Sequence, residues 1–336
     1  MNTATLKRIA VLALALTPLS LLATNSSAAT PQTVNVVGYS IVANAYSALE
    51  KAFSHTGPGQ NVTFTNSFGA STTEAQDVVA GQPADVVNFS LQPDLGLLIN
   101  AGLVSHQWAS TKYDKAEKGM VTDSVVAIVV RPGNPLGIHG WNDLTKAGVS
   151  IVTPDPVSSG SARWNLLAAY ESQLQSGASA GAATTYVNAL IKNVVSEPSS
   201  GSKALSSFIA GTGNVLLAYE SDSLNAFASG QKIQIVQPAQ NLLIENPAAL
   251  TTSGSTNSAA KSFYAFLFSK AGQQIWLNQH FRPTLASLAA VRKTTFYTPT
   301  FLTTVTKLGG WVKVTPKFFG TSGIITKAEN AAGYTS

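Results

Sequence analysis

The sequence contains no cysteine and few charged residues. The lack of cysteine excludes disulfides, thiol catalysis, thiolate metal sites and attachment of a lipid to an N-terminal cysteine. Charged residues make up 11% of the chain, with a formal net charge of +5. No cluster of Lys and Arg interleaved with aromatic residues occurs, so we expect no nucleic-acid partner. The four histidines are scattered without metal-ligand spacing, and no catalytic triad can be assembled. We therefore expect a protein that is not an enzyme and needs no metal or cofactor.

The N-terminus has the order of a secretory signal peptide. Lys7 and Arg8 precede an apolar run over residues 9–23, and Ser27, Ala28 and Ala29 supply small residues for cleavage near Ala29. The apolar run is too short for a stable transmembrane span. We expect residues 1–29 to be removed and the rest to be exported to a periplasm or an extracellular surface. That remainder is long enough for two domains rather than a single core.

The most informative stretch runs from Val149 to Leu167 and reads VSIVTPDPVSSGSARWNLL. A β-branched run stops at two prolines, serines and glycine follow, and a helical apolar spacing then begins. The pattern predicts a strand, a hydroxyl-rich turn and a helix N-terminus. Such an end offers unpaired backbone N–H groups and a partial positive charge, which suit an anion without a charged side chain. The alternative is that Ser159 or Ser161 only caps the helix, as serine commonly does.

Two further turns have the same character, at Ser67–Thr72 and Ser199–Ser202. Each follows a strand or its extension and precedes a helix. The alternation of strands and helices predicts an α/β fold with mixed, mostly parallel sheets flanked by helices, and a ligand site at the carboxyl ends of the strands. Helix N-termini that converge there would surround a small dianion with N–H and O–H donors.

Three other segments carry simpler expectations. The β-branched run Ser124–Val130 is predicted to be one strand. Residues 176–185, rich in Ser, Gly and Ala, are predicted to be a loop, and residues 257–281 have a continuous helical pattern that ends before Arg282-Pro283.

The stretch VSIVTPDPVSSGSARWNLLAAY resembles the signature of the periplasmic sulfate- and thiosulfate-binding proteins of ABC importers. Further stretches resemble that family in the same order, namely GQPADVVNFS, RPGNPLGIHGWNDLTKAGV, SFYAFLFSKAGQQIW with HFRP, and GGWVKV. The resemblance implies a type II-like periplasmic-binding-protein fold whose ligand lies in a cleft between two lobes. Lobe 1 would comprise residues 30–120 and 240–336, and lobe 2 residues 121–239. It also implies a monomer that captures sulfate or thiosulfate and delivers it to a membrane permease.

The family holds sulfate with backbone amides, serine hydroxyls and one indole, without a counter-charge. A fully ionised dianion accepts hydrogen bonds at every oxygen, whereas a buried protonated phosphate would leave its proton unpaired. Matched position by position, the resemblance implies the following ligand-binding residues: Ser40, Ser71, Ser159, Gly160, Ser161, Gly201 and Tyr219.

Some of these positions depart from the family pattern. Ser40 replaces an aspartate, Ser161 a glycine, and Tyr219 the indole. Thr73 and Ser202 stand where the family has a lysine and an arginine. A tyrosine hydroxyl can still donate, but at a different reach from an indole N–H. Another oxyanion, such as molybdate or phosphate, or a small neutral polar solute therefore stays open as the ligand.

Three residues beside these motifs invite a functional interpretation, and for two of them the sequence favours a structural one. Glu220 is expected to cap a helix or bridge the lobes rather than act as an acid or base. Trp311 is expected to pack. For Arg163, packing of the helix against its lobe and contact with ligand remain equally open.

Overall fold

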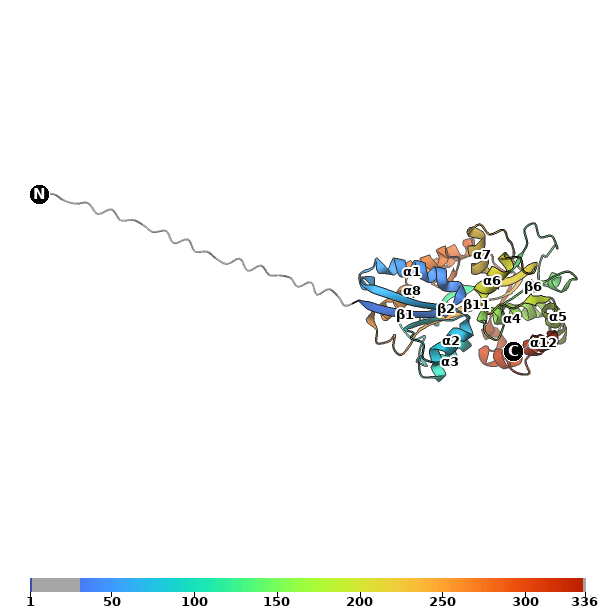
Figure 1. The fold of residues 1–336 in the computed structure, drawn as a ribbon, viewed down its shortest axis with the longest axis horizontal. Helices are drawn as coiled ribbons and strands as arrows, with labels where there is room; N and C mark the ends of the chain where they lie inside the picture. Colours follow the sequence, from blue (N-terminus) through green and yellow to red (C-terminus); the bar gives the residue numbers. More distant parts are fainter. Residues whose placement is uncertain (2–30, 335–336) are drawn as a thin grey trace. The chain divides into compact units, whose positions relative to one another are not determined.

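The computed structural model describes Met1 and residues 31–334. Most of the predicted signal peptide, residues 2–29, lies outside the described residues. Within the described part of the chain, no helix is long and apolar enough to cross a membrane. Strands and helices alternate and build two main sheets flanked by helices, as the sequence pattern predicts (Figure 1).

The first sheet has six strands in the order β12-β4-β11-β3-β1-β2. Their bounds are β1 Gln32–Tyr39, β2 Val62–Gly69, β3 Val86–Asn88, β4 Met120–Ser124, β11 Ile244–Leu250 and β12 Arg282–Pro283. Strand β1 pairs in parallel with β2 and β3, whereas β11 is antiparallel to β3 and β4, and β12 is antiparallel to β4. Strands β1 and β3 are almost wholly apolar and buried along their central residues, as expected of strands covered on both faces.

The second sheet has five strands in the order β7-β6-β8-β5-β9. Their bounds are β5 Val126–Val130, β6 Ile151–Val152, β7 Val194–Ser196, β8 Val215–Tyr219 and β9 Gln234–Val236. Strand β6 is parallel to β7 and β8, whereas β5 is antiparallel to β8 and β9. A separate pair joins β10, Gln240–Leu242, in parallel with β13, Phe301–Thr303.

Helices cover both faces of the first sheet. Helices α1 (Ala43–Ser54) and α8 (Ser258–Phe268) pack on one side of β1 and β2, and α2 (Ser71–Val79) with α3 (Gln92–Asn100) on the other (Figure 1). Helix α9 (Lys270–Asn278) packs against α1 and α8. Phe53, Phe64 and Phe263 meet between α1, β2 and α8 with ring centroids 4.7 to 6.2 Å apart.

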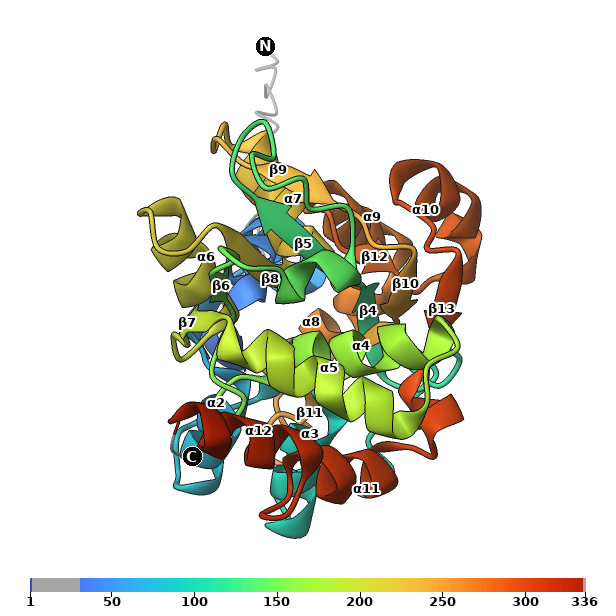
Figure 2. The same cartoon turned by 90° about the vertical axis from the view of Figure 1, so that its right-hand side faces the viewer.

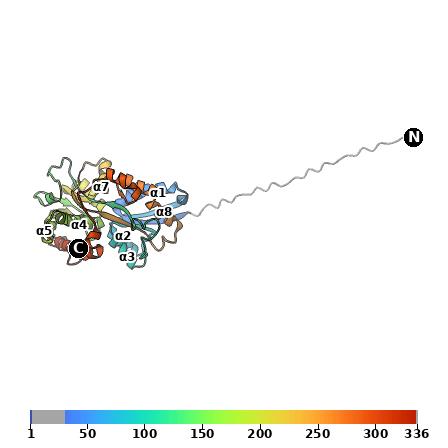
Figure 3. The same cartoon turned by 180° about the vertical axis from the view of Figure 1, so that it is seen from behind.

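The second sheet carries α4 (Gly160–Gln175), α6 (Gly201–Ile209) and α7 (Glu220–Ala228), and α5 (Ala180–Lys192) lies alongside α4 (Figure 2). The last helix, α12 (Ile324–Ala332), packs against α5. Seen from behind, α1 and α8 accompany the first sheet while α4 and α5 accompany the second (Figure 3). The remaining short elements are η1 Ser40–Val42, η2 Gly57–Gly59, η3 Trp141–Thr145, η4 Ala286–Leu288, α10 Ala289–Thr295, η5 Val305–Leu308, α11 Trp311–Val314 and the π-helix η6 Thr315–Phe319.

The run from Ser124 to Val130 is not one strand. The chain leaves β4 at Ser124, passes through Val125 and enters β5 in the other sheet, so the apolar run joins the two sheets. Both strands run antiparallel to their neighbours, as does β11, which lies beside β4. The sheets are therefore mixed, as predicted. Parallel strand pairs do not predominate, because β4, β5 and β11 run antiparallel to their neighbours.

Two other expectations need correction. The segment predicted as a loop at residues 176–185 already begins α5 at Ala180, because the Ser179 hydroxyl accepts a hydrogen bond from the Ala182 N–H and the alanines that follow favour a helix. The helical pattern of residues 257–281 is divided at Ser269. Its hydroxyl accepts from the Gly272 N–H and starts α9 as a separate helix.

Candidate functional site

Four helices begin where strands of the two sheets, or their loops, end. Ala70 separates β2 from α2, Ser159 precedes α4, Ser200 precedes α6, and Tyr219 is both the end of β8 and the residue before α7. The three turns singled out in the sequence therefore each lead into a helix, as predicted. The first backbone N–H groups of a helix have no acceptor within it and carry the positive end of its dipole.

Ser159 occupies the N-cap position of α4, but its hydroxyl makes no capping hydrogen bond. Its Oγ lies instead 2.9 Å from the Oγ of Ser161. Both side chains are buried, at 2% and 4% exposed. Simple capping by Ser159 is thus wrong, and the N–H groups that open α4 receive nothing from this side chain. Ser200 differs, because its hydroxyl does accept from the Lys203 N–H at the start of α6.

The N-terminus of α2 is tied to a buried carboxylate. Ser71 Oγ donates to Asp94 Oδ2 at 2.7 Å, and Thr72 Oγ1 donates to Asp94 Oδ1 at 2.9 Å. Burial raises the pKa of the Asp94 carboxyl, while the hydrogen bond from Ser71, the charge of Arg163 and the hydrogen bond from Thr72 oppose that rise. The hydroxyl proton of Ser71 is therefore directed toward Asp94 and is not available to a ligand. The remaining donors of this helix end are backbone N–H groups, and that of Thr72 already donates to the Ser158 carbonyl.

Ser90 links several of the predicted site residues, although it is not one of the seven. Its N–H donates to Ser71 Oγ at 2.9 Å, and its hydroxyl lies 2.7 Å from the Tyr219 hydroxyl. The indole N–H of Trp164 and the amide of Asn246 both donate to its carbonyl, at 2.9 and 3.1 Å. Ser90 follows β3 by two residues. A serine just beyond the carboxyl end of a predicted strand was the signal that could have identified it.

Tyr219 is fully buried. Burial raises the pKa of its hydroxyl, and the hydrogen bonds with Ser90 and Asn246 only partly counteract this. The phenol therefore keeps its proton at neutral pH and can donate a hydrogen bond. The Tyr39 ring lies 6.1 Å from that of Tyr219, measured between centroids, and closes one side of the group.

The two predicted glycines lie where a side chain would collide with the opposite sheet's loops. A Cβ on Gly160 would lie 2.6 Å from Ser90 Oγ, and a Cβ on Gly201 would lie 2.7 Å from Ile41 Cδ1 and 3.0 Å from Ser161 Oγ. Because neither glycine has a positive φ, the requirement for glycine comes from this close approach and not from the backbone conformation.

Besides the bonds of Ser90 with Tyr219 and Trp164, two more hydrogen bonds join parts of the site that come from different sheets. The Thr72 N–H donates to the Ser158 carbonyl at 3.1 Å, which connects the start of α2 to the loop before α4. The Ser202 N–H donates to Ser40 Oγ at 3.3 Å, which connects the start of α6 to η1. All seven predicted residues thus belong to one connected group: Ser40 and Gly201 meet at η1, Gly201 faces Ser161, and Ser71, Gly160 and Tyr219 all meet Ser90.

The neighbouring charged residues have structural partners. Glu220 accepts two hydrogen bonds from Arg282, the shorter 2.7 Å long, and so joins the start of α7 to β12 of the first sheet. Arg163 donates to the carbonyls of Pro156 and Val157, so it packs on its own loop. Trp311 lies edge-on against Trp164 at 4.9 Å between centroids, which confirms that it packs. Within residues 31–334 and Met1, no three His, Asp or Glu side chains are grouped so as to hold a metal ion.

Comparison with known proteins places this geometry in a family. A family model described as bacterial extracellular solute-binding protein matches residues 34–282. The sulfate-binding protein of Synechococcus elongatus is 35% identical over 90% of this chain and 87% of its own length, and that of Escherichia coli is 33% identical over 90% and 94%. The solved structure of the sulfate-binding protein SubI from Mycobacterium tuberculosis superimposes with a TM-score of 0.81 and 37% identity, over 86% of this chain and 99% of that one. The chain therefore belongs to the bacterial extracellular solute-binding proteins, and within them to the family of the sulfate-binding proteins.

Proposed function

We propose that this protein captures sulfate, or thiosulfate, between two lobes and delivers it to the membrane permease of an ABC importer. The observation that carries the proposal is the uncapped start of α4, which faces the starts of α2 and α6 inside a buried group of serines and glycines. Backbone N–H groups at helix N-termini stabilise anions without a counter-ion. The sulfate- and thiosulfate-binding names of the relatives support the same ligand class.

The proposed contacts come from the seven residues predicted in the sequence, with Ser90 as an added member that holds Ser71 and Tyr219 in place. The site offers mainly N–H and O–H donors. A dianion can accept at every oxygen, whereas a protonated phosphate needs an acceptor and would otherwise bury an unpaired proton. We therefore place phosphate below sulfate, and we place the protein among carriers rather than enzymes.

We further propose that the two sheets mark the two lobes, with residues 30–120 and 240–336 in one and residues 121–239 in the other. The sheet membership of β1–β4, β11 and β12 as against β5–β9 supports this division, with α12 returning to pack against α5. The order of residues 1–29 supports export with cleavage near Ala29, and we propose that the exported chain acts as a monomer.

Calorimetric titration of the purified, ligand-stripped protein tests the ligand. We expect one-to-one binding of sulfate with a Kd of about 1 μM or tighter, equivalent to about 8 kcal/mol, and no heat from phosphate. Thiosulfate and molybdate are titrated in parallel. If sulfate does not bind but thiosulfate or molybdate does, the scaffold assignment stands and the ligand is reassigned to the oxyanion that binds. If no oxyanion binds, the anion assignment fails, and a neutral polar solute becomes the ligand to search for.

The Ser159→Ala variant locates the binding site. Loss of a hydrogen bond to a charged group weakens binding by about tenfold or more. Ser172→Ala is the matched control, because Ser172 is equally buried on the same helix, and its hydroxyl donates to the Ala169 carbonyl and accepts from the Gln173 amide, neither of which belongs to the proposed site. Equal sulfate affinity in Ser159→Ala and Ser172→Ala would place the anion elsewhere.

A further inference from the structure

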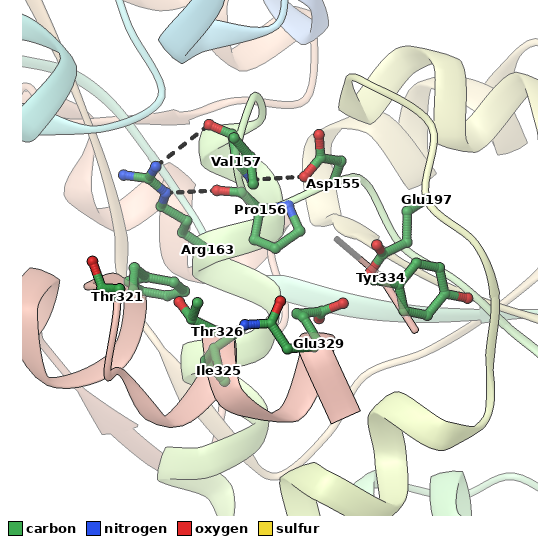
Figure 4. Close-up of a pocket in the computed structure, with 12 residues that line it drawn as sticks. Asp155, Pro156, Val157, Arg163, Glu197, Thr321, Ile325, Thr326, Glu329 and Tyr334 are labelled. Carbon is green, nitrogen blue, oxygen red and sulfur yellow. Dashed lines mark hydrogen bonds between the residues drawn. The ribbon is translucent and has the colours of Figure 1, made fainter. Parts of the chain in front are cut away.

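A cavity lies between α12 and the loops that precede α4 and α6. Its volume is about 810 Å³, and none of the seven proposed sulfate-binding residues lines it. Asp155 and Glu197 come from the two loops, and Glu329 comes from α12 (Figure 4). Apolar and aromatic side chains, among them Phe319, Ile325 and Tyr334, line the rest. The cavity therefore combines acidic groups with apolar walls.

Two of the three carboxyl groups, those of Glu197 and Glu329, have no hydrogen-bond partner in the described chain other than each other. Glu329 is only 3% exposed, and neither of its carboxyl oxygens has a partner. Glu197 Oε1 is likewise buried without one. Asp155 differs, since it accepts from the Val157 N–H at 2.7 Å and from Ser158 Oγ at 2.9 Å. Buried polar groups in native proteins are almost always paired. One shared proton pairs Glu197 with Glu329, and when both carboxyl groups are ionised the pair calls for a positive partner.

The described part of the chain does not supply that partner. Arg163, the cationic residue lining the cavity, donates to the carbonyls of Pro156 and Val157, and its guanidinium lies 5.5 Å from the centre of the Phe319 ring (Figure 4). None of the ion pairs found in that part involves Glu197 or Glu329. The acidic groups are also not arranged as a metal site among the described residues. What fits is an organic cation, because its apolar part can contact the walls and its charge can face both the carboxyls and the aromatic rings.

We propose that this cavity binds a small organic cation, a primary ammonium or guanidinium group on an apolar stem, with the charged end at Glu197 and Glu329. The binding is separate from that of sulfate, so either proposal can fail without the other. Burial raises the pKa of both glutamates. The charge of Glu329 and the hydrogen bond with it raise the pKa of Glu197 further, whereas that hydrogen bond opposes the rise for Glu329, and the charge of Asp155 raises both. Tyr334 and Arg163 are the other titratable groups that line the cavity.

The test uses n-butylammonium chloride as the probe, titrated into the whole protein at pH 7.5 at constant ionic strength. We expect butylammonium to bind one-to-one with a Kd of about 1 mM or tighter. The neutral analogue 1-butanol should not bind. Glu329→Gln keeps the shape but removes the charge, and should weaken the binding by about tenfold or more, as expected for a hydrogen bond between charged groups. Glu197→Gln gives a second measurement if Glu329→Gln does not fold, with sulfate binding as the check on folding.

A tenfold loss in either glutamine variant, with butylammonium binding unchanged in Ser159→Ala, supports the proposal. No binding to the wild-type protein at 10-fold above the expected Kd (roughly 10 mM), or a loss below tenfold in both glutamine variants, overturns it. N-acetyl-lysine methylamide, titrated in parallel, distinguishes two sources of the ammonium group. Binding as tight as that of butylammonium indicates that a protein side chain can enter the cavity, and weaker binding indicates a free small molecule.

Discussion

The hydroxyl groups of Ser90 and Tyr219 form a 2.7 Å hydrogen bond between the loop after β3 and the end of β8. The bond therefore joins the two sheets at the proposed anion site. The family resemblance implies an indole at position 219; the Tyr219 phenol reaches Ser90 and also lies 3.5 Å from the Asn246 amide. Sulfate binding in this protein should accordingly depend on a hydroxyl group at this position.

Replacing Tyr219 with phenylalanine removes that hydroxyl and keeps the ring. We expect sulfate affinity to fall by about 2- to 12-fold, the equivalent of one hydrogen bond, with little loss of stability. Tyr170→Phe is the control, because Tyr170 is also buried but its hydroxyl interacts with the Ala180 carbonyl, at 3.4 Å, and with Thr184, away from the proposed binding residues. Titration calorimetry on both variants decides; unchanged affinity in Tyr219→Phe would remove the phenol from the binding group.

Gly160→Ala tests the close approach across the site. Its Cβ would lie 2.6 Å from Ser90 Oγ and 2.8 Å from Leu91 Cγ, so the loop after β3 must move away from α4. Strain of about 1–3 kcal/mol should weaken sulfate binding by about 5- to 150-fold.

Gly181→Ala is the matched control for Gly160→Ala. Gly181 is also in the first turn of a helix, and the nearest atom to its Cβ would be 3.9 Å away. That variant should bind sulfate normally and unfold at a slightly higher temperature, since alanine favours the helix by up to about 1 kcal/mol. Wild-type sulfate affinity in Gly160→Ala would show that the two loops need not approach as closely as the structure has them.

The Glu220–Arg282 pair is buried, with side chains 1% and 9% exposed. Removing one partner leaves a buried charge without compensation, so Arg282→Met should lower the free energy of unfolding by about 3–5 kcal/mol. The Lys146–Asp143 pair, with side chains 56% and 18% exposed, gives the more solvent-accessible comparison, and Lys146→Met should cost less than about 1 kcal/mol. Urea unfolding measures both. A loss in Arg282→Met no greater than that in Lys146→Met would contradict the bridging role.

Asp222 should make stability depend on pH. Burial raises the pKa of its carboxyl from 3.8 to about 7, and one carboxyl oxygen has no partner within the described chain. Between about pH 4 and pH 7 the folded protein holds a proton that the unfolded chain has released, so stability falls as pH rises through this range, by up to about 1.4 kcal/mol per pH unit.

Asp222→Asn should remove this contribution and make the variant relatively more stable toward pH 7. Urea unfolding at several pH values measures the effect, and the exposed Asp77→Asn variant serves as control. If the wild-type protein and Asp222→Asn lose stability in parallel over this range, Asp222 is not the group that titrates.

Local pattern was enough to predict most of the elements. The strand, turn and helix N-terminus predicted within Val149–Leu167 are found as β6, the loop that ends at Ser159, and the start of α4, because the two prolines end the strand and the helical apolar spacing begins after the serines. The wrong predictions are at segments whose local sequence pattern is compatible with two structures. The run around Val125 is continuous in sequence but changes sheets, and alanines after Ser179 extend a helix into what composition suggested was a loop.

The sequence by itself determined that three hydroxyl-rich stretches lead into helices. Through the family resemblance it also pointed to seven ligand-binding residues, and that assignment stays a prediction. It could not assign Ser90, nor the direction of the Ser71 hydroxyl toward Asp94, nor the bond from Arg282 to Glu220. Only the tertiary structure decided these, because each joins residues from 19 to 62 positions apart. A few neighbouring residues determine where a helix begins. The side chains that contact this helix end depend on how the two sheets bring distant loops together.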